Sequence, residues 1–175
     1  MEEKFIMTAF CKDRPGIVAD ITETIYENGC NLEDSTMTSI LDEFAIILIF
    51  VGKGDSLKDQ LLRDCRRLER EKGITAFIRS VEVEDKEKQI NFFTKTINVE
   101  GIDQTGIVFK ISGYLANNNI NIENLTSRRS ISPESGTALY FMGIKVQVPE
   151  KISLENLEKG LSQVGEELNL DITVR

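Results

Sequence analysis

Apolar residues follow two different periods along the chain. Residues 4–11 and 90–99 are rich in β-branched and aromatic side chains, which predicts strands. After each strand, apolar residues recur at a spacing of four, which predicts a helix with one buried face. These helices are expected to end at Gly29 and Asn119, because glycine and asparagine best tolerate a left-handed position. The periodic residues are Ile17, Ile21 and Ile25, and then Ile107, Ile111 and Leu115.

The patterns that follow complete one order of elements, which occurs twice. Each first helix precedes two more strands, an amphipathic helix and a last strand, so the predicted order is βαββαβ in both halves. The second helices use apolar positions within 57–68 and 154–168. The expected strands are 31–39, 44–51 and 75–83 in the first half and 121–131, 138–148 and 170–175 in the second.

The two halves are copies of one module at an offset of 90 residues. "DRPGIV" falls on "DQTGIV", and "NGCNLEDST" falls on "NNINIENLT". Two homologous modules explain this agreement better than chance. We expect one domain over residues 1–85 and another over 90–175. The charged stretch Glu82–Ile90 would join them as a short linker or as a strand end that runs into the next strand.

This order of elements is typical of an α+β fold, the ferredoxin-like sandwich. Each module would form an antiparallel four-stranded sheet with both helices on one face. In the first module, residues 44–51 contain no polar side chain, so the face without helices should be buried against a partner. In the second module, Lys145 and Gln147 alternate with apolar residues, as in a half-solvated strand. We therefore expect the two modules to have different surroundings.

Composition excludes several classes of function. The net charge of −8 is spread over both halves, so a primary nucleic-acid role is not expected. The basic stretch 63–70 is interleaved with acids and is interpreted as a solvated face, and Arg128 and Arg129 form the other basic candidate. The chain has no histidine and no CxxC pair among three cysteines, so neither a metal site nor a disulfide framework is predicted. Its longest apolar run is too short to span a membrane, and we expect a cytoplasmic protein.

The turn from the first strand into the first helix carries the candidate chemistry of each module. A helix N-terminus has unpaired backbone N–H groups and positive potential, which suits carboxylates and phosphates. Gly16 and Gly106 would let the backbone approach such a ligand, and Pro15 would preorganise the first turn. Asp13 and Asp103 have two possible roles, capping the helix or holding the ammonium of a zwitterion.

Asn31 and Asn121 begin the second predicted strand of each module. They are either turn residues after the helix or ligand contacts. We call the segments Asp13–Ile17 and Asp103–Ile107 the first and second corners.

Residues 13–36, "DRPGIVADITETIYENGCNLEDST", resemble the ACT domain, a small-molecule regulatory module with a ferredoxin-like fold. Residues 103–126 resemble a second, divergent copy, and the tandem layout is similar to regulatory proteins typified by the glycine cleavage system transcriptional repressor. The resemblance implies paired modules, as in a homodimer, with an amino acid bound between the corner of one module and the second strand of another. The implied contacts are Asp13, Arg14, Pro15, Gly16, Ile17 and Asn31, with Asp103, Gln104, Thr105, Gly106, Ile107 and Asn121 in the second copy.

This chain departs from the family pattern in two ways. Cys11 and Gly101 stand where some amino-acid-binding members have histidine, and "DQTG" replaces "DRPG" in the second corner. If only one corner binds, we expect it to be the first.

Enzyme and RNA-binding readings of the same fold fit the sequence less well. The phosphate loop of acylphosphatases needs more glycine than Gly16 alone provides, and the strand at 44–51 lacks the stacking aromatics and basic residues of an RNA-recognition module. We expect a non-enzymatic regulator, without cofactor, that controls transcription of amino-acid metabolism by protein contact, with no direct nucleic-acid or membrane binding. A regulatory subunit of an amino-acid biosynthetic enzyme and a ligand-free interaction scaffold are the alternatives.

Overall fold

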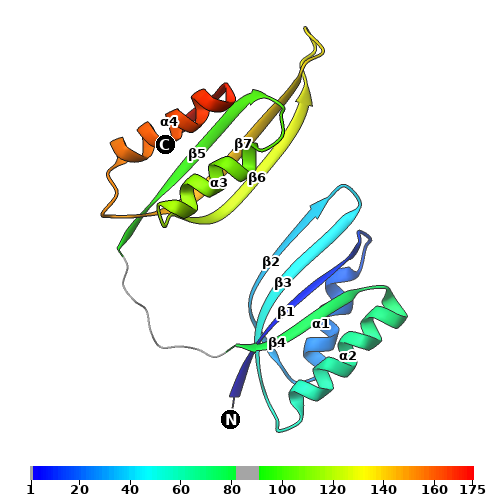
Figure 1. Ribbon diagram of the computed structural model, residues 1–175. Helices are drawn as coiled ribbons and strands as arrows, with labels where there is room; N and C mark the ends of the chain where they lie inside the picture. The colour runs from blue at the N-terminus through cyan, green and yellow to red at the C-terminus, as the bar shows by residue number, and fades with distance from the viewer. Residues whose placement is uncertain (1, 82–90) are drawn as a thin grey trace. The chain divides into compact units, whose positions relative to one another are not determined.

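The computed structural model describes residues 2–81 and 91–175 and divides the chain into two compact units, Met1–Glu87 and Lys88–Arg175. We call them the first and second modules (Figure 1). The stretch Glu82–Ile90, predicted to be a linker or a strand end, lies outside the described residues. The expected boundaries at 85 and 90 fall in that stretch and stay a prediction.

The first module has the predicted βαββαβ order. It contains β1 (Glu2–Lys12), α1 (Ile17–Glu27), β2 (Asn31–Ile40), β3 (Glu43–Lys53), α2 (Leu57–Lys72) and β4 (Thr75–Val81). The strands form one antiparallel sheet in the order β2-β3-β1-β4. Figure 1 shows α1 and α2 on the same side of this sheet.

The second module repeats this architecture. Its elements are β5 (Phe92–Ile102), α3 (Ile107–Asn117), β6 (Asn121–Ile131), β7 (Ala138–Pro149), α4 (Leu154–Leu168) and β8 (Leu170–Val174). The sheet order is β6-β7-β5-β8, again antiparallel. The predicted fold, two ferredoxin-like sandwiches in tandem, is therefore confirmed.

Each core lies between a sheet and its two helices. Alternate residues of β1 are buried, and Phe5 packs against Phe50 of β3 with ring centroids 5.7 Å apart. The period-four residues of α1 and α3 complete the two cores, as their spacing predicts. Both helices begin after a left-handed glycine, at φ of 92° in Gly16 and 93° in Gly106. The predicted left-handed residues Gly29 and Asn119 follow their ends, with φ of 65° and 54°.

The sheet face without helices, which we call the open face, differs between the modules. In the first module it carries Phe10, Ile47 and Phe77, each at least 45% exposed, and the rings of Phe10 and Phe77 stack at 6.2 Å. The register places Glu100, Gly143 and Thr173 at the matching positions of the second module. The open face is thus apolar in one copy and polar in the other, and the partner expected for the apolar face stays a prediction.

The glycine before each helix is required by its backbone angle. A Cβ on Gly106 would meet no heavy atom within 4 Å, yet φ of 93° is a region that L side chains rarely adopt. We expect Gly106→Ala to lower the free energy of unfolding by about 1–2 kcal/mol. Gly113→Ala, in the interior of the same helix and also in open space, should instead raise it by about 0.5–1 kcal/mol. Urea denaturation of both variants checks this, and equal effects would contradict it.

Candidate functional site

The Asp13 carboxylate of the first corner is anchored to the end of β2. The Asp13 backbone N–H donates to the carbonyl of Asp42 at 2.7 Å, and the Ser39 hydroxyl donates to Asp13 Oδ2 at 2.7 Å. Gly16, and not Asp13, occupies the N-cap position, and no side chain among residues 2–81 and 91–175 caps α1. The capping role considered for Asp13 is therefore wrong, because β2 and not the helix engages its carboxylate.

The N-terminus of α1 is open. Its first intrahelical bond runs from the Asp20 N–H to the Gly16 carbonyl at 2.9 Å, so the N–H groups of residues 16–19 have no partner within the helix. These donors and the helix dipole give the corner positive potential. The side chains of Asp13, Arg14 and Pro15 are exposed beside it.

Arg14 joins the corner to the end of the second helix. Its guanidinium donates to Asp20 Oδ2 at 2.8 Å and to the carbonyl of Lys72 at 3.3 Å. The Lys72 ammonium contacts the other oxygen of Asp20 at 3.0 Å. These two hydrogen-bonded cations, Arg14 first and Lys72 second, hold the pKa of Asp20 below its usual value. In this structure Arg14 therefore fixes the corner and does not point freely toward a ligand.

The second corner has the same backbone but different side-chain contacts. The Asp103 N–H donates to the Ala138 carbonyl at 2.9 Å, and Arg129 Nε donates to Asp103 Oδ2 at 2.7 Å. Gln104 donates to the Leu168 carbonyl at the end of α4, as Arg14 does to Lys72 at the end of α2. Asp103 does not cap α3 either, since Gly106 is the N-cap and no side chain in the described part of the chain caps this helix.

Several predicted contacts can offer only their backbone. The side chains of Ile17 and Ile107 are each 2% exposed and belong to the cores. Thr105 is exposed beside the N-cap of α3 and makes no side-chain hydrogen bond to the parts of the chain that the structure describes. A ligand at the first corner would therefore be held mainly by main-chain N–H groups and by Asp13, and the second corner offers the Thr105 hydroxyl in addition.

Asn31 and Asn121 lie far from the corner of their own module. Asn31 pairs with Val51, which pairs with Lys4, whereas the first corner follows Lys12 at the opposite end of β1. The eight residue steps from Lys4 to Lys12 span roughly 26 Å at about 3.3 Å per residue. Asn121 lies at the equivalent place and donates to Gln147 Oε1 at 3.3 Å. Within one module, the structure does not bring the corner and the strand start together.

Ser39 and Arg129, which bind the two aspartates, were missed in the sequence. They occupy equivalent positions at the offset of 90, each at the far end of the second strand. The signal that could have found them is the register of the sheet, which places that strand end, across one intervening strand, level with the residues just before the corner. One is neutral and the other is a cation, so the two corners differ in charge.

Neither fully buried cysteine is set up as a nucleophile. Burial raises the pKa of Cys65 to about 11 and also raises that of Cys11. Residues 2–81 and 91–175 contain no cluster of three or more side chains able to hold a metal ion. Within the same ranges, no helix is long and apolar enough to cross a membrane.

Comparison with known proteins identifies the class. Models of the ACT domain match residues 3–79 and 95–152, so the chain belongs to the ACT-domain family and carries two copies. It is 23% identical to the glycine cleavage system transcriptional repressor of Escherichia coli over 164 aligned residues. The aligned region covers 94% of this chain and 85% of that protein.

Two solved structures share the whole fold. A protein of unknown function from Galdieria sulphuraria is 25% identical, with a TM-score of 0.79. The match covers 100% of this chain and 98% of that protein's chain. A candidate glycine cleavage system transcriptional repressor is 19% identical, with a TM-score of 0.75, and covers 100% and 97%. At its 19% identity, the second structure shows likeness of fold alone.

The ion pairs of Asp20 predict how the stability of the first module depends on pH. Because the folded pKa is lowered, the stabilisation by Asp20 is present above about pH 4 and is lost as pH falls through the folded pKa. We expect Asp20→Asn to lower the urea midpoint at pH 7 and to differ less from the unmodified protein at pH 3. A gap that stays constant between these pH values would contradict this assignment.

Proposed function

We propose that this protein is a non-enzymatic regulator that binds an amino acid at the first corner and passes that occupancy to a protein partner. The observation that carries the proposal is the open N-terminus of α1 at Gly16, beside the exposed carboxylate of Asp13. Membership of the ACT-domain family supports the same reading.

The two groups of the corner match the two charges of an amino acid. The N–H groups of residues 16–19, which have no partner within the helix, suit the ligand carboxylate. The Asp13 carboxylate already accepts one hydrogen bond from Ser39, and its remaining acceptor capacity suits the ligand ammonium. The side chain of Ile17 is buried in the core and fixes the start of α1.

The first corner is the better candidate of the two. Arg129 neutralises Asp103 at 2.7 Å, whereas the neutral Ser39 leaves the charge of Asp13 in place. An ammonium group at the second corner would have to compete with that guanidinium. We therefore assign the primary site to Asp13–Ile17 and leave Asp103–Ile107 as a weaker site.

A second ACT module would complete the site. The corner and Asn31 are separated by roughly 26 Å along the sheet, so one module cannot supply both to a single amino acid. In our proposal Asn31 or Asn121 of another module, for instance in a homodimer, contacts the ligand. The ligand then favours the paired arrangement by its difference in affinity between the paired and unpaired states.

The output we propose is control of transcription by protein contact. The Escherichia coli relative is named a transcriptional repressor, and this chain carries a net charge of −8, which disfavours direct binding to DNA. The exposed apolar face with Phe10 and Phe77 is a surface that such a partner could cover.

A screen of the twenty amino acids by thermal denaturation tests ligand binding. A ligand at a hundred times its Kd should stabilise the protein by about 2.7 kcal/mol and raise its melting temperature. If no amino acid raises the melting temperature, the proposal that the protein binds an amino acid fails, and a ligand-free interaction scaffold becomes the better account.

Asp13→Asn tests the first corner with little disturbance, because the amide oxygen can still accept from Ser39. Loss of the charge should weaken amino-acid binding about tenfold, which corresponds to about 1.4 kcal/mol. The matched control is Asp103→Asn, which should have a smaller effect because Arg129 already neutralises that carboxylate. Isothermal titration calorimetry measures both, and an equal or larger loss in the control would contradict the assignment.

Affinity purification of the protein with bound ligand tests the output. Recovery of a transcription factor supports the proposal. Recovery of an amino-acid biosynthetic enzyme in its place would identify a regulatory subunit and overturn the transcriptional role.

A further inference from the structure

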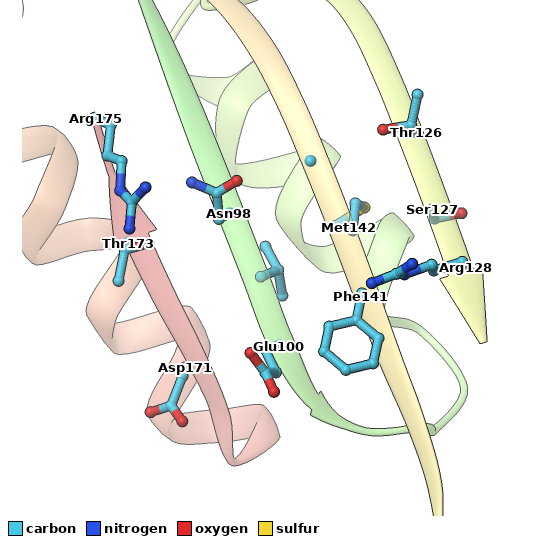
Figure 2. A pocket seen from close by; sticks show the side chains of 12 residues that line it. Asn98, Glu100, Thr126, Ser127, Arg128, Phe141, Met142, Asp171, Thr173 and Arg175 are labelled. Atoms are coloured by element: carbon cyan, nitrogen blue, oxygen red, sulfur yellow. The ribbon is translucent and has the colours of Figure 1, made fainter. Parts of the chain in front are cut away.

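A hollow of about 530 Å³ lies on the open face of the second module, away from both corners. Figure 2 shows it spread over all four strands of the sheet. Its floor is a row of small residues that lie opposite one another on neighbouring strands. From β6 to β8 they are Thr126, Gly143, Asn98 and Thr173.

Gly143 makes this surface concave. The register places Gly143 opposite Asn98, and the matching residue of the first module is Ile47, opposite Thr8. Thr173 likewise replaces Phe77. The first module fills these positions with the side chains of Ile47 and Phe77, which are 46% and 62% exposed, so its open face is not hollowed at the matching place.

Charges of both signs border this floor. The next row along the strands consists of Arg128, Phe141, Glu100 and Asp171, again opposite one another. The Arg128 guanidinium lies 5.2 Å from the centre of the Phe141 ring. In Figure 2 the two carboxylates lie on one side of that ring and Arg128 on the other, while Arg175 borders the hollow beyond Asn98.

The charged groups of this row have no partner of opposite charge in the described part of the chain. Among the described residues, no ion pair or side-chain hydrogen bond involves Arg128, Glu100, Asp171 or the side chain of Arg175. Glu100 and Asp171 are direct cross-strand neighbours, an arrangement in which like charges destabilise a sheet. A bound cation would remove that repulsion. Arg129, on the other face of the same strand, is by contrast committed to Asp103.

We infer that the hollow is a second binding site, which takes a small zwitterion with both a carboxylate and an ammonium group. The carboxylate pairs with the forked donors of Arg128, which the Phe141 ring holds in place. The ammonium group lies between Glu100 and Asp171, and the body of the ligand occupies the space above Gly143. This site is independent of the first corner, and its occupancy would be a second input to the same protein.

The open shape of the hollow sets the expected strength. The charged side chains around it are exposed, so each ionic contact is screened by water and salt. We expect weak binding that falls further as ionic strength rises.

Titration of the ¹⁵N-labelled full chain, followed by NMR, tests the inference with L-methionine as the probe. Saturable shifts are expected at the backbone amides of Asn98, Gly143 and Thr173. N-acetyl-L-methionine lacks the ammonium group and L-methionine methyl ester lacks the carboxylate, so each should bind at least fivefold more weakly. Equal shifts with all three probes would overturn the zwitterion assignment.

Two variants locate the site. Gly143→Val places a β-branched residue where the first module has Ile47, and its Cβ would meet only Thr126 Oγ1, at an ordinary 3.6 Å. It should keep or raise the melting temperature and abolish the shifts. Arg128→Met should weaken binding at least fivefold, whereas Lys110→Met, which removes a positive charge from α3 on the helix side of the sheet, should leave it unchanged.

The outcomes separate this inference from the proposed function. Methionine shifts confined to residues around Gly16 would overturn the second site and leave the first-corner proposal standing. Shifts at Asn98 and Thr173 that persist in folded Gly143→Val and Arg128→Met would also overturn it, and so would the absence of any shift. Shifts at Asn98 and Thr173 that both variants remove, without shifts around Gly16, would support the second site alone.

Discussion

The register between the two central strands of each sheet is the constraint on which the rest of the structure depends. Phe5 lies opposite Phe50, and Ile97 lies opposite Ile144, with all four side chains buried beneath the helices. Because side chains alternate between faces, a slip of one residue would expose these side chains and turn neighbours such as Lys4, Asn98 and Lys145 toward the core. The same register fixes the corner at one end of β1 and the start of β2 at the other. It also decides which residues form the open face, including the row that floors the hollow.

The sequence allowed the elements and the fold to be predicted because both depend on local patterns. Apolar periods give the strands and helices, and the duplication at an offset of 90 supports each assignment twice. The left-handed Gly29 and Asn119 were predicted for the same reason, since a helix end has a local signature.

The side-chain contacts of the corner were not predictable in this way, because they come from strands distant in sequence. Asp13 was considered a helix cap from its position alone, but Ser39 engages it across the sheet. Arg14 is among the contacts that the family resemblance implies, and its guanidinium is held by Asp20 and by the end of α2, which no local pattern indicates. The hollow at Gly143 depends on all four strands of the second sheet and has no signal within any one segment.

Comparison of the two copies shows how a duplicated fold can diverge in chemistry while its backbone is kept. The ion pair between the first and second helices is reversed, Asp20 with Lys72 in one module and Lys110 with Glu167 in the other. The second module also differs from the first in the cation beside Asp103 and in its polar open face. The first module keeps an available aspartate at an open helix start and an apolar open face. This division favours ligand binding at the first corner and partner binding on the first sheet.

A crystal structure with a bound amino acid tests the central claim most directly. The account predicts that the ligand carboxylate lies about 2.7–3.2 Å from backbone N–H groups of residues 16–19, with its ammonium group at Asp13. It also predicts that the same ligand contacts Asn31 or Asn121 of another module. A ligand held wholly within one module, or bound away from the start of α1, would contradict it.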